Sequence, residues 1–328
     1  MRSLLLAFLV ISISCNRSET IGSIERVDPG LDSIIANDAK VEVISSGYTW
    51  SEGPLWIENK KMLLFSDVPA NTVFKWTEAK GTEIYLKPSG YTGSVARGGE
   101  TGSNGLALDM DGRLVLCQHG NRQVARMDAD LDDPKPVFSA IADNFQSKKF
   151  NSPNDLVWRR NGDLFFTDPP YGLEKNMDDP LKQLNFQGVY CVKSSGEVKL
   201  LVDSITRPNG IALTPDEKTL VIANSDTAKP YWYAYDLAEN DSLINPRIFF
   251  DSRQAGETDR RAPDGFKFDS KGNMFASGPG GILIFDKNAK ILGKIKTPGD
   301  VSNCALSKDE KTLYITANKY VLRVKMRE

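Results

Sequence analysis

Side chains that carry oxygen recur at regular intervals along this chain of 328 residues. Each one opens a short apolar run, and successive positions are 52, 50, 55, 55 and 39 residues apart. The six positions are Glu52, Asn104, Asn154, Asn209, Asp264 and Asn303. Carboxylate and amide oxygens are the ligands that calcium prefers, and the ion takes about six to eight of them. If the six side chains meet in space, they predict a site for a hard divalent cation, whose charge Glu52 and Asp264 would balance.

The repeat also predicts the elements that position these side chains. In each copy a second apolar run follows a turn, as Asp111-Gly112-Arg113-Leu114 follows the run that starts at Asn104. A repeat of this length, built from short strands and turns, indicates a β-propeller. Six copies predict an all-β fold, a six-bladed β-propeller with a central metal site, because the first strand of every blade lines the channel. The alternative is that these residues only form turns, as Asn-Gly and Asp-Gly pairs often do.

The overall charge excludes one class of partner. The net charge is −2 and the isoelectric point is near 5.7. Domains that bind nucleic acid carry a basic patch or stripe, which this composition does not offer. The sequence therefore predicts no nucleic-acid partner.

Residues 1–15 have the features of an export signal. Arg2 forms a short basic region, and the apolar stretch that follows is shorter than the roughly twenty residues that a membrane-spanning helix needs. The sequence Ser12-Ile13-Ser14-Cys15 resembles a bacterial lipobox, in which the cysteine is lipid-modified and becomes the mature N-terminus. We therefore expect an exported bacterial protein, periplasmic or membrane-anchored through a lipid on Cys15. Ordinary secretory cleavage near Ser14 is the alternative.

The rest of the chain is expected to divide into a polar linker, residues 16–39, and one catalytic propeller domain, residues 40–328. The alternating segment Val41-Glu42-Val43-Ile44 precedes the first copy of the repeat. It is expected to pair with residues 320–325 as the outermost strand of the last blade. Such pairing joins the two ends of the chain and removes a free sheet edge.

Three cysteines, Cys117, Cys191 and Cys304, lie inside apolar runs of different copies. An odd number spread over three blades argues against a disulfide framework. We expect buried free thiols that pack as small hydrophobic groups.

Two long loops interrupt the repeat. Residues 88–103 are rich in glycine and serine and lead into Asn104, and residues 169–187 follow the apolar run that ends at Asp168. Long irregular loops in compact domains are usually functional or disordered. We interpret both as lids over the channel, with disorder as the alternative for the first.

His119 is the only histidine, which excludes a histidine-rich zinc site. It lies 15 residues after Asn104, and Asp168 lies 14 residues after Asn154. These similar offsets predict that both residues lie near the channel end of their blades, where they are candidates for binding substrate. A purely structural role for His119 is the alternative.

Seven short motifs occur in order at blade spacing. They are Ser51-Glu52-Gly53-Pro54-Leu55-Trp56, Ser103-Asn104-Gly105-Leu106, Cys117-Gln118-His119-Gly120-Asn121-Arg122, Asn151-Ser152-Pro153-Asn154-Asp155-Leu156, Phe166-Thr167-Asp168-Pro169-Pro170-Tyr171-Gly172, Arg207-Pro208-Asn209-Gly210 and Pro263-Asp264-Gly265. With these motifs the chain resembles the gluconolactonase and senescence-marker-protein (regucalcin-like) family of six-bladed propellers, most closely its bacterial gluconolactonase branch. The resemblance covers about residues 40–328.

The resemblance implies a set of metal ligands, namely Glu52, Asn154, Asn209 and Asp264. It also implies that Asn104 and Asn303 lie beside the metal or face the substrate. The expected cofactor is Ca²⁺, or another divalent cation. Asp264 is the expected catalytic residue, either as the base that takes a proton from water or, as argued for a related branch, as a nucleophile.

The function that these features imply is calcium-dependent hydrolysis of a sugar lactone. The cation would polarise the lactone carbonyl while a carboxylate assists the attack of water. The expected partner is thus a small-molecule lactone. One alternative is a hydrolase of another ester or of a phosphotriester on the same site. A propeller that binds a ligand without catalysis is the other.

Overall fold

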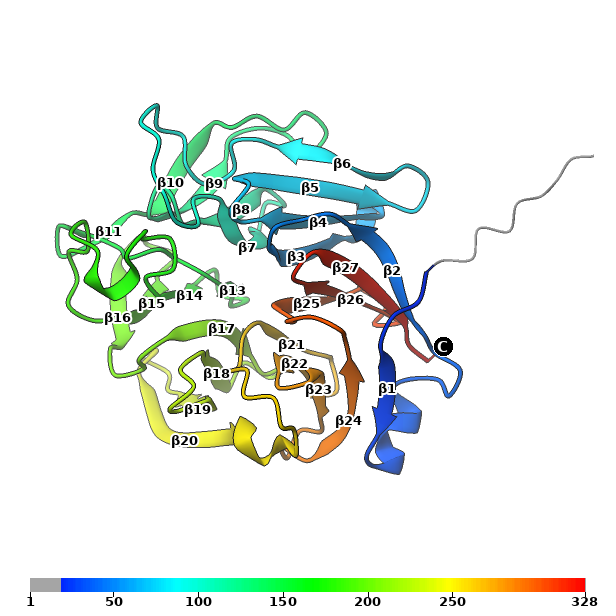
Figure 1. Cartoon of the computed structure of the whole chain (residues 1–328). Helices are drawn as coiled ribbons and strands as arrows, with labels where there is room; N and C mark the ends of the chain where they lie inside the picture. Colours follow the sequence, from blue (N-terminus) through cyan, green and yellow to red (C-terminus); the bar gives the residue numbers. More distant parts are fainter. Residues whose placement is uncertain (1–18, 328) are drawn as a thin grey trace, which may run out of the picture.

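The computed structural model describes residues 19–327 and shows a six-bladed β-propeller (Figure 1). Residues 1–18, which include the predicted export signal and Cys15, lie outside the described residues. The innermost strands contact one another in sequence around the ring, and the last of them also contacts the first. The predicted fold class and the number of blades are therefore confirmed.

Each blade is an antiparallel sheet whose strands follow one another outward from the axis. Blade 1 contains β3 (Ser51–Ile57), β4 (Met62–Asp67), β5 (Thr72–Thr77) and β6 (Gly81–Leu86). Blade 2 contains β7 (Ser103–Leu108), β8 (Leu114–Gln118), β9 (Gln123–Met127) and β10 (Phe138–Ala142). Blade 3 contains β13 (Leu156–Trp158), β14 (Leu164–Asp168), β15 (Gly188–Val192) and β16 (Val198–Val202).

The second half of the ring repeats this arrangement. Blade 4 contains β17 (Pro208–Leu213), β18 (Thr219–Asn224), β19 (Tyr231–Leu237) and β20 (Leu243–Asp251). Blade 5 contains β21 (Phe266–Phe268), β22 (Met274–Gly278), β23 (Gly281–Phe285) and β24 (Ile291–Lys296). Blade 6 contains β25 (Asn303–Leu306), β26 (Thr312–Ala317) and β27 (Tyr320–Lys325). The short hairpin β11 (Asn144–Phe145) and β12 (Lys148–Lys149) joins blades 2 and 3, and the 3-10 helices are η1 (Pro29–Ser33), η2 (Glu58–Lys60), η3 (Asn176–Asp178) and η4 (Ser252–Ala255).

The hydrophobic core consists of layers between blades. Buried apolar side chains form a cluster between each pair of neighbouring blades in the described part of the chain. Every residue of β4 and β15 is buried, whereas most of the outer strand β20 is exposed or half-buried. Strands with a blade packed on both faces read as continuous apolar runs, which explains why the repeat is visible in the sequence. Cys117, Cys191 and Cys304 lie in these layers as buried free thiols, as predicted.

The closure of the ring follows the sequence prediction. The segment β2 (Val41–Ser46) pairs with β27 in antiparallel register and completes blade 6. Because the first and last parts of the propeller share one sheet, opening the ring requires breaking this pairing. The edge of blade 6 is thereby protected from pairing with another chain.

The structure differs from the predicted polar linker. Within residues 16–39, β1 (Ser23–Arg26) adds a fifth strand to blade 5 by pairing with β24, beside which Figure 1 shows it. Leu31 and Ile35 are fully buried against blades 5 and 6. Few apolar residues spaced among polar ones gave no strand or helix pattern in the sequence. The folded domain therefore begins before residue 40.

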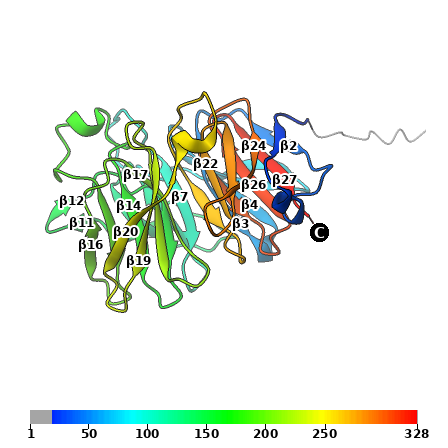
Figure 2. The same ribbon diagram turned by 90° about the horizontal axis from the view of Figure 1, so that it is seen from below.

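Figure 2 shows the propeller from the side, with long loops gathered at one end of the blades. None of the helices within residues 19–327 has the length and apolar character needed to cross a membrane.

Candidate functional site

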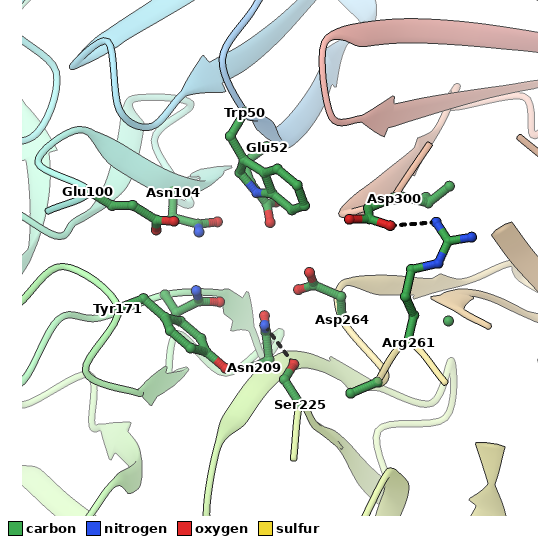
Figure 3. Close-up of a pocket in the computed structure, with 14 residues that line it drawn as sticks. Trp50, Glu52, Glu100, Asn104, Tyr171, Asn209, Ser225, Arg261, Asp264 and Asp300 are labelled. Carbon is green, nitrogen blue, oxygen red and sulfur yellow. Dashed lines mark hydrogen bonds and ion pairs between the residues drawn. The ribbon is translucent and has the colours of Figure 1, made fainter. Parts of the chain in front are cut away.

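A central pocket of about 250 Å³ lies where the innermost strands begin. Every blade or the loop leading into it contributes lining residues, many of them polar (Figure 3). The lining residues are Trp50, Glu52, Glu100, Asn104, Asn154, Tyr171, Asn209, Ser225, Arg261, Ala262, Asp264, Gly278, Asp300 and Val301. Five of the six repeated side chains identified in the sequence thus meet in one place.

Irregular backbone directs these five side chains into the pocket. The pairing of the first two strands is interrupted by a bulge next to Glu52, Asn104 and Asn209. In blades 3 and 5 the first strand begins two residues after Asn154 and Asp264, so these residues lie on irregular chain. A bulge changes the direction of a side chain relative to a regular strand. The pocket residues can therefore point at the axis while the strands keep their apolar faces between blades.

The glycines that follow the repeated residues allow the inner strands to approach closely. A Cβ atom on Gly53, whose φ is +52°, would lie 2.0 Å from the carbonyl oxygen of Asn104. A Cβ atom on Gly210 would lie 2.4 Å from the carbonyl oxygen of Asp264. The Glu-Gly and Asn-Gly pairs at these positions are therefore not hairpin turns. Only glycine, which has no Cβ, fits where the strands converge.

Several pocket oxygens lack a partner. Oδ1 of Asn104, of Asn154 and of Asp264 is buried and accepts no hydrogen bond within the described residues. Buried polar atoms are almost always hydrogen-bonded, and unpaired ones call for an explanation such as a bound ion. Three of them at one pocket are acceptors that could bind a cation or a hydrogen-bond donor from outside the chain.

The amide of Asn209 is oriented by a short chain of hydrogen bonds. Its Nδ2 donates to Oγ of Ser225 at 2.9 Å, and that hydroxyl donates to the carbonyl oxygen of Pro263 at 2.5 Å. Since its nitrogen is engaged, the oxygen of Asn209 remains available to the pocket. Pro263 precedes Asp264, so the same contacts connect the positions of Asn209 and Asp264.

Two of the pocket carboxylates, those of Glu52 and Asp264, have raised pKa values. Burial raises the pKa of Glu52, and the nearby charge of Asp155 raises it further, although Glu52 accepts a hydrogen bond from the backbone N–H of Gly53 at 3.0 Å. Burial and the charge of Glu52 raise the pKa of Asp264 well above its ordinary value. A bound cation would reverse both shifts, because it favours the charged form of neighbouring acids.

These residues fit a divalent cation. Within residues 19–327, no three His, Cys, Asp or Glu side chains group in a way that could hold a metal by themselves. The donor set at the pocket is instead mixed, with carboxylates from Glu52 and Asp264 and amide oxygens from Asn154 and Asn209. All four are oxygen donors, as hard cations such as Ca²⁺ and Mg²⁺ require.

Three of the expected substrate-binding residues do not line the pocket. Asp168 is fully buried, and its two carboxylate oxygens accept the backbone N–H groups of Asn151 and Ser152 at 2.8 Å each. It thus fixes the segment that leads to Asn154. Asn303 is buried in the channel, where its Oδ1 accepts the backbone N–H of Cys304 at 2.8 Å.

His119 also differs from the sequence interpretation. The residue of blade 2 that pairs as Asp67 does in blade 1 is Gln118, because Ser103 lies opposite Gln118 and Ser51 lies opposite Asp67. His119 follows the end of β8 and is fully buried behind the pocket lining. Although His119 lies a similar number of residues after Asn104 as Asp168 does after Asn154, it does not occupy the equivalent position in its blade.

The sequence reasoning missed several lining residues that come from loops. Glu100 and Tyr171 belong to the two long loops that were interpreted as lids, and both reach the pocket. Arg261 and Asp300 come from the loops that lead into blades 5 and 6, and they form an ion pair at 2.7 Å. The unusual length of the two lid loops was the available signal. Nothing in the sequence pattern singled out Arg261 or Asp300.

Comparison with known proteins agrees with this architecture. A gluconolactonase from Zymomonas mobilis is 40% identical over 320 residues, which cover 93% of this chain and 86% of that protein. A lactonase, drp35, from Staphylococcus saprophyticus is 27% identical over 59% of this chain and 56% of its own length. A solved gluconolactonase structure from Xanthomonas campestris superposes with a TM-score of 0.80 at 27% identity, over 95% of this chain and 99% of that one.

A family model also matches most of the propeller. Residues 50–319 match the model described as the SMP-30/Gluconolactonase/LRE-like region, a range that contains all the pocket residues named above. The match, the identity to the Zymomonas protein and the central pocket lead to one conclusion. The chain belongs to the SMP-30/gluconolactonase/LRE-like family.

Proposed function

We propose that this protein is a lactonase that hydrolyses a sugar lactone with the help of Ca²⁺ or another divalent cation. The observation that carries the proposal is the group of buried, unpartnered oxygens beside two carboxylates whose pKa values are raised. The names of the Zymomonas, Staphylococcus and Xanthomonas relatives support hydrolysis of a lactone ester. Glu52, Asn154, Asn209 and Asp264 would hold the cation.

When bound, the cation would polarise the carbonyl of the lactone and lower the pKa of the carboxylates that hold it. The chain's own residues then have separate tasks. Asp264, whose Oδ1 faces no protein donor, accepts a proton from the attacking water. The backbone N–H of Gly265 donates to the carbonyl of Ser302 at 2.7 Å, which fixes the chain next to this carboxylate.

The overall reaction balances simply. The water oxygen forms a bond to the carbonyl carbon, the bond from that carbon to the ring oxygen breaks, and a proton passes to the ring oxygen as it becomes a hydroxyl group. The product is an open-chain hydroxy acid. General-base assistance of this kind typically contributes a factor of about 10²–10⁴ to the rate.

The test is hydrolysis of aldonolactones, followed as acid release in a pH-stat with the spontaneous rate subtracted. Turnover that a chelator removes and added calcium restores would support the proposal. A parallel panel of simple esters and a phosphotriester separates the hydrolase alternative, since a preference for either would exclude a sugar lactone as the main substrate class. Absence of turnover on every compound, with calcium binding intact, would favour a propeller that binds a ligand without catalysis.

We further propose that the protein is exported and anchored to a membrane by a lipid on Cys15. The support is the short apolar stretch that ends in Ser12-Ile13-Ser14-Cys15. Cys15→Ser should release the protein from the membrane fraction or leave it unprocessed. Mass spectrometry that finds an unmodified mature N-terminus after Cys15 would contradict the anchor and favour ordinary secretory cleavage.

A further inference from the structure

Glu100 is a third carboxylate in the pocket, and its environment differs from that of the other acidic residues there. Its side chain is 36% exposed and lines the cavity. Within the described residues its carboxylate accepts no backbone hydrogen bond, whereas Asp300 on the pocket rim is paired with Arg261 at 2.7 Å. Figure 3 shows Glu100 and Asn104 on the same side of the pocket, across from Arg261 and Asp300. On this side, free acceptors therefore face the cavity.

The imidazole of His119 lies directly behind Glu100. Its Nδ1 is 3.5 Å from Oε2 of Glu100. The side chain of His119 is fully buried, and neither ring nitrogen has a hydrogen-bond partner in the part of the chain that the structure describes. A buried imidazole in a folded protein normally uses its nitrogens. The carboxylate of Glu100 is the group toward which it can donate.

The loop that carries Glu100 is held on both sides. Oδ1 of Asn71 accepts the backbone N–H groups of Ser89, Gly90 and Tyr91 at 3.1, 2.7 and 3.1 Å. The guanidinium of Arg97 donates to the carbonyl oxygens of Gly120 and Gly172 at 2.6 and 3.0 Å, which ties this loop to its neighbours. Glu100 is therefore presented to the pocket from a fixed segment.

A carboxylate that accepts hydrogen bonds suits a ligand rich in hydroxyl groups. It has two oxygens and about four lone-pair sites, so it can receive two neighbouring hydroxyl groups at once. The unpartnered Oδ1 of Asn104 offers a further acceptor on the same side. An unsubstituted lactone ring has no hydroxyl group to donate to Glu100 or to Oδ1 of Asn104, and acceptors that a bound ligand covers without pairing disfavour binding.

We propose that Glu100 is a specificity-determining residue that binds the hydroxyl groups of a polyhydroxylated lactone, and that His119 is the residue that positions it. This inference rests on the proposed lactonase function but concerns which lactones are accepted. It explains why a histidine that does not reach the pocket is placed against the pocket wall.

The test compares two six-membered lactones, glucono-1,5-lactone and δ-valerolactone, which differ in their hydroxyl groups. Glu100→Gln should lower the ratio of kcat/KM for gluconolactone over δ-valerolactone by about 10- to 100-fold, as expected when a site built to bind hydroxyl groups loses a charged acceptor. Glu174→Gln is the matched control, because it removes an exposed carboxylate that lies beside the same loop at Gly98 and does not line the pocket. An unchanged ratio in Glu100→Gln would overturn the proposal.

His119 needs a readout that a merely structural role would not move. His119→Gln retains an N–H donor and should preserve most of the preference for gluconolactone, whereas His119→Phe keeps a ring without a donor and should lose it mainly through KM. Equal ratios in the two variants would overturn the positioning role. Melting temperatures show whether either variant is unfolded, and Glu100→Gln tests the pocket side of the proposal without altering a buried residue.

Binding of non-hydrolysable lactams separates this inference from the proposed reaction. Calorimetry with gluconolactam and with 2-piperidone measures recognition of hydroxyl groups in the absence of turnover. Weaker binding of gluconolactam alone to Glu100→Gln supports the inference even if the wild-type protein hydrolyses no lactone, an outcome that would refute only the proposed function. No measurable gluconolactam binding to wild type, or reduced calcium affinity in Glu100→Gln with an unchanged lactam preference, would overturn the inference.

Discussion

Two pairs of buried carboxylates in this propeller differ in the hydrogen bonds that they receive from the backbone. Asp67 and Asp168 lie at the ends of second strands, and each accepts two backbone N–H groups from the segment that leads to a pocket residue. Glu52 and Asp264 instead line the pocket, where burial and neighbouring acids raise their pKa values. Each member of the first pair accepts two backbone N–H groups, whereas Glu52 accepts one and Oδ1 of Asp264 accepts none within the described residues.

This difference indicates that Asp67 and Asp168 stabilise the fold, whereas Glu52 and Asp264 serve the pocket. Asp67 and Asp168 connect the entrance of an inner strand to the end of the next strand, so they hold Glu52 and Asn154 in place. Glu52 and Asp264 give up hydration with little return from the protein. Substitutions in the two pairs should therefore act on different observables.

The largest effect is expected at Asp264. Asp264→Asn keeps the size of the side chain and one oxygen but removes the base, so kcat at saturating calcium should fall by about 10²–10⁴-fold. Asn154→Ala should act through cation affinity and be partly rescued by high calcium. Occupancy must be verified by calorimetry in both variants. A calcium-filled Asp264→Asn enzyme that works within a few-fold of wild type would show that Asp264 is only a ligand.

Calcium should stabilise the wild-type protein but not a variant that lacks the carboxylate of Glu52. Free calcium at about 100 times Kd adds about 2.7 kcal/mol to the free energy of unfolding, provided that it binds only the folded state. Glu52→Gln should lose most of this gain, while Glu174→Gln keeps it. Differential scanning calorimetry with and without chelator provides the measurement. Equal calcium gains in wild type and Glu52→Gln would remove Glu52 from the cation site.

The cation-free protein should become less stable as the pH rises. Acids whose folded-state pKa is raised contribute stability that is fully present below the unfolded pKa and is lost as the pH rises through the folded value. Glu52 and Asp264 have raised pKa values, and burial raises the pKa of Asp168 to about 7. Between pH 5 and pH 8 the free energy of unfolding should fall by several kcal/mol, because each unit by which a folded-state pKa exceeds the unfolded value corresponds to about 1.4 kcal/mol and three acids contribute.

Urea titrations of chelator-treated protein at several pH values measure this trend. Calcium should oppose it, since the cation favours the charged carboxylates and binds more tightly as they lose their protons. A flat profile without calcium would contradict the raised pKa values of the pocket acids. Glu52→Gln provides the control and should flatten the profile in part.

A substitution of Asp67 or Asp168 should affect the free energy of unfolding more than it affects catalysis. Asp168→Asn retains one acceptor oxygen, but its Nδ2 would face the backbone N–H of Asn151 or Ser152 and leave that donor unpaired. The expected loss in the free energy of unfolding is about 1–2 kcal/mol. Asp178→Asn, an exposed substitution in the same loop region, should leave stability unchanged. Equal stability of the two variants would argue against the scaffold role of Asp168.

The smallest effect is expected for the ion pair on the rim of the pocket. The side chains of Arg261 and Asp300 are 29% and 51% exposed, and such pairs contribute about 0–1 kcal/mol. Asp300→Asn should therefore change the unfolding free energy by less than about 1 kcal/mol, and the change should shrink with added salt. A larger, salt-independent loss would mean that the rim supports the fold in the way that Asp168 does.

The sequence by itself determined the ring and most of the candidate cation site. Each inner strand is packed between blades, so its apolar run must recur, and the polar residue that opens it recurs with it. Glu52, Asn104, Asn154, Asn209 and Asp264 could be identified because their places depend on this local repeat. The pairing of β2 with β27 followed from the same count, since the strand before the first copy of the repeat was left over.

Only the tertiary structure decided which other residues reach the pocket. Glu100 and Tyr171 are brought there by contacts between loops far apart in the chain, such as those of Arg97 with Gly120 and Gly172. His119 does not line the cavity, because it lies one residue beyond the position at the end of β8 that pairs with Ser103. Repeats reveal positions that every blade must fill, because packing imposes the same demand six times. A loop contact arises once, so no periodic signal marks it in the sequence.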